Sequence, residues 1–217
     1  VDGVDYERSQ VVTAYIDIEV AVDKGFPKPE DALQPVTAIT MAVDDKYYVL
    51  HYGEYAVHRD DVVEIKCKDE IDLLLKFGDL WGRLDPDIIT GWNCMFFDIP
   101  YLVNRITNRL GDKKARQLSP WNMLIKNERE MHGKTQLSYK IVGIEILDYL
   151  DLYKKFTYSQ QESYRLDHIG HVELGEKKID YSEYGSLQTL YVENHQKFIE
   201  YNVKDVELVV NIDAKMK

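Results

Sequence analysis

The sequence predicts one α/β domain in which helices flank a mixed sheet. Three observations support this fold class. Three β-type segments open the chain, helical and β-type segments alternate after them, and the length of 217 residues suits a single large domain. Hydrophobic residues make up 45% of the chain and charged residues 30%, a balance typical of a globular protein with a buried core.

The three opening strands are predicted over residues 11–22, 36–43 and 46–52. The first strand alternates apolar and polar residues, which predicts one buried face and a second face that carries Asp17 and Glu19. Two aspartates separate the second strand from the third and predict a hairpin turn.

The rest of the chain is predicted to be mainly helical, because apolar residues recur at helical spacing in four further segments. The expected elements, in order, are a helix over 69–84, a strand over 87–92, a helix over 99–110 that ends at Gly111, a hairpin over about 121–147 with its turn at 132–134, a strand running into a short helix over 145–156, a helix over 165–172 and one long helix over 187–215. No repeat or linker divides them, so we expect residues 1–217 to form one domain.

Charge is unevenly distributed along this acidic chain, whose net charge is −11. Residues 1–98 carry 9 Lys and Arg against 21 Asp and Glu, whereas residues 99–155 carry 11 against 6. The positive segment is either an ordinary solvated face or a surface that attracts a polyanion.

Cysteine count and hydropathy disfavour several protein classes. Cys67 and Cys94 are the only cysteines, which argues against a disulfide framework and favours a reducing, cytosolic setting. No apolar run reaches the ~20 residues of a membrane span, and no signal peptide is recognisable. Because the chain begins with Val1 rather than Met, we expect it to be a piece of a longer protein.

Four acidic residues stand where a carboxylate is costly unless it has a partner. Asp17 and Glu19 project from the same face of a strand, so they either bind one cation together or face solvent. Asp98 precedes a helix and is either its N-cap or a site residue. Asp205 lies on the apolar side of the last helix, four residues after Tyr201, which indicates either a Tyr–Asp hydrogen bond or a metal ligand.

Together these acids predict a site for a hard divalent cation. Carboxylate oxygens without clustered His or Cys suit Mg²⁺ or Mn²⁺ rather than zinc. His168 and His171 have no third ligand at zinc spacing and are interpreted as structural or surface residues. The loop before Asp98 holds Asn93 and Phe97, either as core packing or as a surface on which bases stack. Neither G-x-x-x-x-G-K-[ST] nor G-x-S-x-G occurs, which disfavours NTP hydrolysis and the common serine hydrolases.

Three short motifs, in this order, resemble those of the 3′–5′ proofreading exonuclease domain of family-B DNA polymerases. DIE at residues 17–19 is similar to the first exonuclease motif, NCMFFD at 93–98 to the second, and YNVKD at 201–205 to the third. The stretches TGWN, FDIPY, ILDYLDLYKKF and NHQKFIEYN are similar to the replicative polymerases of T-even-type phages. The resemblance extends over nearly the whole chain.

This resemblance implies an RNase H-like fold and phosphodiester hydrolysis with two divalent cations, Mg²⁺ or Mn²⁺. It implies that Asp17 bridges both metals and that Asp98 holds the second one. Glu19 and Asp205 would complete the site of the metal that activates water, and Tyr201 would hydrogen-bond that water. Such a metal pair stabilises the attacking and leaving oxygens of an in-line displacement.

The resemblance also implies contacts with a single-stranded DNA 3′ end. Phe26, Asn93 and Phe97 are expected to contact the terminal nucleotides. The hairpin over 121–147 is similar to one that helps to separate primer from template, although it could equally be a simple extension of the sheet. No palm motif of the D-x-x-S-L-Y-P type occurs, so we expect the polymerase domains to be absent from this chain.

The expected function is therefore metal-dependent removal of nucleotides from single-stranded DNA 3′ ends, as the proofreading part of a phage-type polymerase. A non-catalytic module that guides the DNA end or supports the polymerase is the alternative, and a free-standing RNA-trimming exonuclease is a third candidate. The expected partners are DNA and the remaining domains of the parent chain, with no membrane. We expect a monomer that acts in the cytoplasm of an infected bacterial host.

Overall fold

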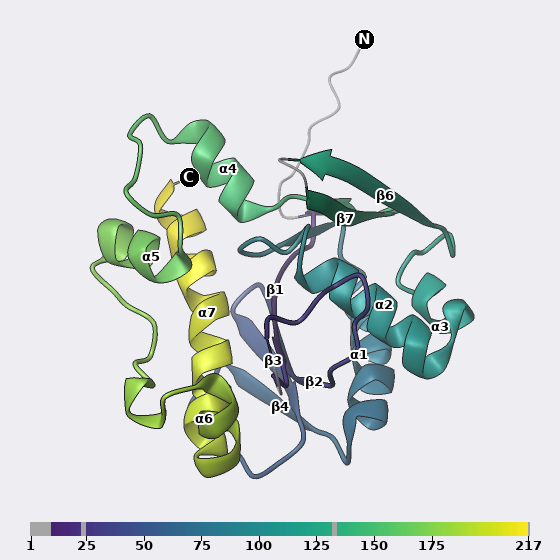
Figure 1. Ribbon diagram of the computed structural model, residues 1–217, viewed down its shortest axis with the longest axis horizontal. Helices are drawn as coiled ribbons and strands as arrows, with labels where there is room; N and C mark the ends of the chain where they lie inside the picture. The colour runs from purple at the N-terminus through teal and green to yellow at the C-terminus, as the bar shows by residue number, and fades with distance from the viewer. Residues whose placement is uncertain (1–9, 23–24, 132–133, 217) are drawn as a thin grey trace.

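The computed structural model describes residues 10–22, 25–131 and 134–216 of the chain. Its main sheet has six strands in the order β4-β3-β2-β1-β5-β8 (Figure 1). Neighbours β1, β2 and β3 pair antiparallel, whereas the other three neighbouring pairs are parallel, so the sheet is mixed as predicted. The strands are β1 (Thr13–Val20), β2 (Val36–Val43), β3 (Lys46–His51), β4 (Val62–Lys66), β5 (Ile88–Thr90) and β8 (Glu145–Ile146).

Helices cover both faces of this sheet (Figure 1). On one face, α1 (Glu70–Leu84) and α2 (Asp98–Leu110) share a hydrophobic core with β1 and β2. On the other face, α7 (His195–Met216) packs with α5 (Leu166–Leu174) and α6 (Leu187–Glu193). The described residues also form α3 (Asp112–Arg116), α4 (Tyr149–Phe156) and a 3₁₀ turn (Ser182–Tyr184). No helix in the described part of the chain is long and apolar enough to cross a membrane.

Strand β1 lies between the two helical layers, and this position explains its buried acids. Ile16 and Ile18 are 2% and 5% exposed and pack into the core beneath α1 and α2. Asp17 and Glu19 alternate with them and therefore lie on the opposite face, under α7. The interpretation of these acids as a solvent-exposed face does not hold for Glu19, which is only 9% exposed, whereas Asp17 is half-buried.

The inserted hairpin consists of β6 (Leu124–Met131) and β7 (Lys134–Ile141), which form a separate antiparallel sheet. Its predicted turn over 132–134 includes two residues, 132 and 133, that lie outside the described ranges. The hairpin is attached to α2, because the Tyr139 hydroxyl donates a hydrogen bond to Oδ1 of Asn104 over 2.7 Å.

Three elements differ from the prediction. Strand β4 was not predicted, because its five residues form an edge strand without a regular polar alternation. Helix α3 is a short five-residue segment that follows Gly111 directly. The expected helix over 187–215 is two helices, because Asn194 leaves the helical backbone and its Oδ1 accepts the N–H of Lys197 over 3.0 Å. This cap starts a new helix, α7.

Candidate active site

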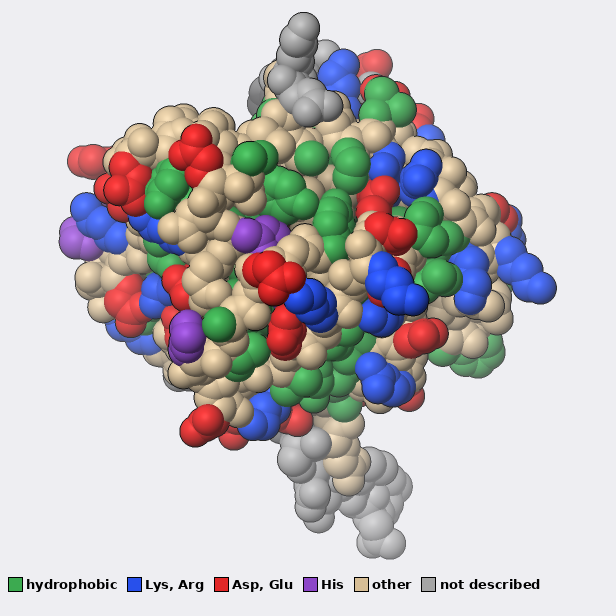
Figure 2. Space-filling view, turned by 90° about the horizontal axis from the view of Figure 1, so that it is seen from below, with side chains coloured by type: hydrophobic (Ala, Val, Ile, Leu, Met, Phe, Trp, Pro, Cys, Tyr) green, Lys and Arg blue, Asp and Glu red, His purple; other side chains and the backbone are tan. Residues whose placement is uncertain are grey.

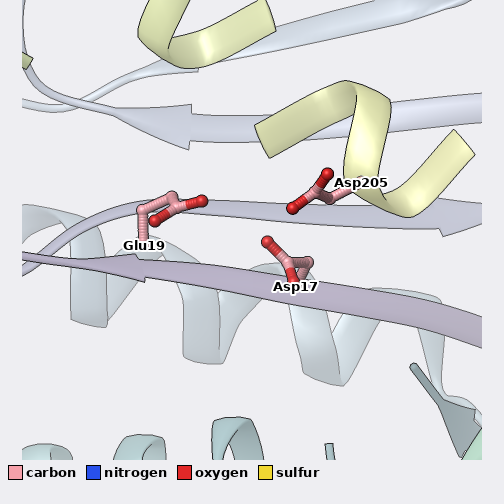
Figure 3. Close-up of side chains that lie close together, drawn as sticks. All are labelled: Asp17, Glu19 and Asp205. Carbon is pink, nitrogen blue, oxygen red and sulfur yellow. The ribbon is translucent and has the colours of Figure 1, made fainter. Parts of the chain in front are cut away.

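Two elements bring three carboxylates together (Figure 3). Asp17 and Glu19 project from β1, and Asp205 projects toward them from α7. One oxygen of each carboxylate lies within 4.8 Å of the others. Alternation along β1 and the helical position of Asp205 therefore produce one acidic cluster from residues that are far apart in the sequence.

Asp98 lies beside this cluster and is bound to the backbone of β1. Its Oδ1 accepts the N–H of Ile18 over 3.0 Å, and its side chain is buried. The close approach of the loop before α2 depends on Gly91, where an added Cβ would lie 2.4 Å from the carbonyl oxygen of Ile16. The N-cap interpretation of Asp98 is wrong, because the cap position of α2 is Phe97 and no side chain caps the helix there.

Lys178 connects two of the predicted residues. Its Nζ donates to the hydroxyl of Tyr201 over 3.1 Å and to Oδ2 of Asp205. Burial alone would lower the pKa of Lys178, but Asp205 and Tyr201 outweigh that effect and raise the pKa. Lys178 is therefore a protonated cation inside the acidic site.

The remaining charge of the cluster is incompletely compensated. Burial, reinforced by the neighbouring carboxylates, raises the pKa of Asp17 well above its usual value. Burial likewise raises the pKa of Glu19 to about 8 and that of Asp98 to about 7. Such shifts mean that the ionised site lacks positive charge.

The donor set fits a divalent cation. Oδ1 of Asp205 is buried and has no hydrogen-bond partner within the described ranges, so one carboxylate oxygen of the cluster is a buried, unsatisfied acceptor. Carboxylate oxygens from Asp17 and Glu19 lie within 4.8 Å of a carboxylate oxygen of Asp205. Oxygen ligands of this kind are those that Mg²⁺ and Mn²⁺ prefer.

A groove of about 910 Å³ adjoins the acids. Its lining includes Asp17, Asn93, Lys178 and Tyr201. Asn93 has a left-handed backbone with φ 67°. Its N–H donates to the buried carboxylate of Asp148 over 3.1 Å, which holds the turn in place.

The other two predicted substrate residues lie against each other. The ring centroids of Phe26 and Phe97 are 5.4 Å apart, and Phe26 is 80% exposed. Phe97 directly precedes Asp98, so this aromatic pair neighbours the acids along the chain. The structure thus places Asn93 in the groove and the two phenylalanines together.

Comparisons with known proteins identify the family of the chain. Residues 4–169 match the family described as DNA polymerase family B, exonuclease domain. The chain belongs to the family B exonuclease domains. Such domains are hydrolytic enzyme domains, and their assignment here confirms the RNase H-like fold class predicted from the motifs.

Individual relatives of this exonuclease domain include two phage enzymes. It is 36% identical to the DNA-directed DNA polymerase of Escherichia phage RB69 and 35% identical to that of Enterobacteria phage T4. These alignments cover 97% and 96% of this chain and 26% of each relative. It is also 27% identical to the DNA polymerase delta catalytic subunit of Caenorhabditis elegans, over 70% of this chain and 15% of that protein. The chain spans about a quarter of the length of the phage polymerases it matches.

Three residues at or beside the candidate site were not predicted from the sequence: Lys178, Asp148 and Asn202. Lys178 lies between α5 and the 3₁₀ turn, where no periodic pattern marks it. Asp148 is the N-cap of α4 and additionally binds the Asn93 turn. Asn202 did leave a signal, since it is a polar residue at the a/d spacing of α7, four residues after Phe198 and three before Asp205.

Proposed function

We propose that this exonuclease domain removes nucleotides from the 3′ ends of single-stranded DNA by phosphodiester hydrolysis, as a proofreading activity. The observation that carries this proposal is the convergence of Asp17, Glu19 and Asp205 beside Asp98, next to a groove. Membership of the family B exonuclease domains supports the same reaction.

The acids would hold two divalent cations, Mg²⁺ or Mn²⁺. Asp17, Glu19 and Asp205 would hold one of them, and Asp98 together with Asp17 would hold the second. When bound, such a pair stabilises the attacking and leaving oxygens of the phosphodiester. The unpartnered Oδ1 of Asp205 supports this assignment, because a buried acceptor without a donor is costly.

The protein's own residues would orient the reactants. Lys178 fixes the hydroxyl of Tyr201, which would then hydrogen-bond the attacking water. The ammonium group of Lys178 would also lie close to the phosphate as its charge develops. Both side chains line the groove, so a DNA end in the groove would meet them.

The DNA end would be held by stacking and by charge. Phe26 and Phe97 offer aromatic faces to bases, and Asn93 would contact the terminal nucleotide from the groove. Figure 2 shows that Lys and Arg side chains gather toward the right of the view, the side on which α3 lies in Figure 1. Helix α3 itself carries Lys113, Lys114 and Arg116. This local positive surface would attract DNA despite the net charge of −11.

In the longer protein, residues 1–217 would act as one domain beside the polymerase domains. The hairpin of β6 and β7 would lie at the junction of primer and template. As part of a phage-type polymerase, a monomeric domain of this kind would act in the cytoplasm of an infected bacterial cell.

Digestion of an oligonucleotide tests the proposal. With Mg²⁺ or Mn²⁺, the purified chain should shorten a 5′-labelled single strand stepwise from its 3′ end, and EDTA should stop the reaction. Asp17→Ala should abolish cleavage without unfolding the protein, and Tyr201→Phe should slow it while some activity remains. A labelled RNA strand of the same sequence should be cut more slowly.

Each other outcome points to a different function. An oligonucleotide that stays intact with either metal, but is bound, would favour the non-catalytic module that guides a DNA end. Faster cutting of RNA would favour the RNA-trimming exonuclease. Cleavage by Asp17→Ala at the wild-type rate would show that the activity comes from another site.

A further inference from the structure

Helix α7 carries a buried amide, Asn202, between Tyr201 and Asp205 in the sequence. The side chain of Asn202 is 0% exposed, and a buried amide is costly unless both its ends are hydrogen-bonded. Both ends are bonded here. Nδ2 donates to Oδ2 of Asp17 over 2.7 Å, and Oδ1 accepts the hydroxyl of Thr40 over 2.5 Å.

The register of β1 and β2 brings together Asp17 and Thr40, the two ends of this chain of hydrogen bonds. Asp17 of β1 and Thr40 of β2 are directly opposite each other in the antiparallel pair. Their side chains therefore project from the same face of the sheet, toward α7. Asn202 reaches down from α7 and bridges them, so three elements contribute one residue each.

The direction of these bonds is important. An ionised carboxylate only accepts hydrogen bonds, so it needs the NH₂ end of the amide. Thr40 donates to the oxygen end and thereby keeps the NH₂ end toward Asp17. Without the Thr40 hydroxyl, the oxygen end of the buried amide would lose its donor, and the amide would be held only at its NH₂ end, by Asp17.

We propose that Thr40 and Asn202 are positioning residues that fix the carboxylate of Asp17 for divalent-cation binding. The inference rests on the proposed function, because it assumes that Asp17 is a metal ligand. Groups that orient a metal ligand in this way typically change metal affinity or activity by about 10-fold to 100-fold when they are lost. Neither residue is expected to contact DNA.

We call the hydrogen-bonded series Thr40–Asn202–Asp17 the relay. Titration of the full chain with Mn²⁺ alone, followed by the electron paramagnetic resonance of the unbound ion, tests it. Asn202→Leu, which keeps the branching at Cγ but removes the donor, should weaken Mn²⁺ binding about 10-fold or more. Thr40→Val should weaken it as well, although Thr40 does not bond to Asp17, and Thr40→Ser should restore it. Thermal unfolding checks that each variant is folded.

The matched control is Thr107→Val, which removes a threonine hydroxyl bonded to the Val103 carbonyl within α2. This variant should bind Mn²⁺ like the wild type. In cleavage assays, Asn202→Leu and Thr40→Val should raise the metal concentration needed for half-maximal rate and leave the affinity for single-stranded DNA in EDTA unchanged. If the two residues had only a structural role, the variants would lose stability but would not need more metal while keeping the same affinity for DNA.

The outcomes separate the relay from the function on which it rests. If the wild type binds Mn²⁺ and cuts DNA, but Thr40→Val binds Mn²⁺ equally well, the relay is wrong and the proposed function stands. If Thr40→Ser and Thr40→Val are equally weak, the hydroxyl is not the cause and the relay is again wrong. If the wild type neither binds Mn²⁺ nor cuts DNA, both proposals fall. Should Asn202→Leu not fold, Thr40→Val and Thr40→Ser decide the matter.

Discussion

At the scale of single residues, Lys178 shows how one loop side chain compensates a buried acidic cluster. Its Nζ donates a hydrogen bond to Oδ2 of Asp205, while Oδ1 of that carboxylate has no partner in the described ranges. The same carboxylate can therefore hold the lysine and a metal ion at once. Lys178 also fixes the Tyr201 hydroxyl, so it links charge compensation to the orientation of that group.

Replacing Lys178 by methionine should reduce cleavage strongly. Lys178→Met removes a fixed cation beside the acids and releases the hydroxyl of Tyr201. Preorganised electrostatic groups of this kind typically contribute about 10²-fold to 10³-fold in rate. We therefore expect the single-turnover rate at saturating DNA to fall by about 100-fold, measured with a 5′-labelled single strand in Mg²⁺.

The neighbouring lysine provides a matched control. Lys177 also lines the groove, and Lys177→Met changes the net charge by the same amount. A small effect of Lys177→Met, seen mainly in DNA affinity, is expected. If both variants slowed cleavage equally, Lys178 would act only through the general charge of the groove.

How far the site could be predicted depends on whether a residue breaks a pattern. Asp205 interrupts the apolar face of α7, and an acid at such a position already calls for a partner. Asp17 and Glu19 follow the polar alternation of β1, so the pattern alone also allowed a solvent-exposed pair. Asn202 interrupts the stripe of α7 as well, but an amide does not specify its partner. Lys178 interrupts nothing, because its loop has no periodicity, and only the folded chain brings it to the acids. The roles of all these residues remain predictions.

At the scale of elements, α2 positions both Asp98 and the loop that follows Phe26. Its first turn carries Asp98, and Phe97 precedes it. One stripe along its side donates hydrogen bonds to carbonyls of the loop that follows Phe26: Tyr101 to Gln34, Asn104 to Pro29, Arg105 to Ala32 and Leu33, and Asn108 to Asp31. The loop is thereby attached to the helix that also positions the acid.

A buried ion pair secures this loop, and breaking it should destabilise the domain. Arg105 binds Glu70 through two hydrogen bonds of 2.6 and 2.7 Å, and the two side chains are 8% and 10% exposed. Arg105→Met would leave the Glu70 carboxylate buried without its main partner. Such a loss typically costs about 3–5 kcal/mol. Urea denaturation should show a decrease of this size in the free energy of unfolding.

Two further variants check the cause of that decrease. Lys76→Met breaks an exposed pair with Asp72, 3.0 Å apart, and should lower the free energy of unfolding much less than Arg105→Met. The double variant Arg105→Met with Glu70→Leu should recover part of the loss, because no unpaired charge remains buried. A double variant that is less stable than Arg105→Met would indicate that packing, rather than the stranded charge, explains the decrease.

The elements themselves were predictable where their periodicity is long. Strand β1 and helices α1 and α2 follow their apolar patterns to within a few residues. Strand β4 is short and depends on parallel pairing with β3, a long-range contact that no local pattern specifies. The break at Asn194 does have a local cause, since asparagine is a favoured N-cap, but continuous apolar spacing on both sides concealed it.

At the scale of the whole molecule, the acidic cluster makes the stability of the metal-free fold depend on pH. The pKa of Glu19 is raised to about 8 and that of Asp98 to about 7, mainly by burial. Between their ordinary values and these raised values, the folded state binds more protons than the unfolded state. The free energy of unfolding therefore falls as pH rises through this range.

Other titrating groups limit the pH range in which the stability of the fold reports on Glu19 and Asp98. Burial lowers the pKa of His195 to about 4 and also lowers that of His51, so their effect on stability is confined to pH values below about 6.5. Burial raises the pKa of the thiols of Cys67 and Cys94, which affect stability only above about pH 8. Between these limits, the carboxylates of the site dominate the pH dependence.

In EDTA, the free energy of unfolding should fall by on the order of 2 kcal/mol between pH 6.5 and pH 8, because the folded state must release protons from Glu19 and Asp98. Mn²⁺ should raise stability most at pH 8, where the ionised ligands need no deprotonation, and so remove the decrease. Urea titrations at several pH values measure both effects. The variant Glu19→Gln with Asp98→Asn should show a flatter profile with or without metal. A wild-type profile that is flat or rising in EDTA would contradict the raised pKa values, and with them the shortage of positive charge that the metals are proposed to relieve.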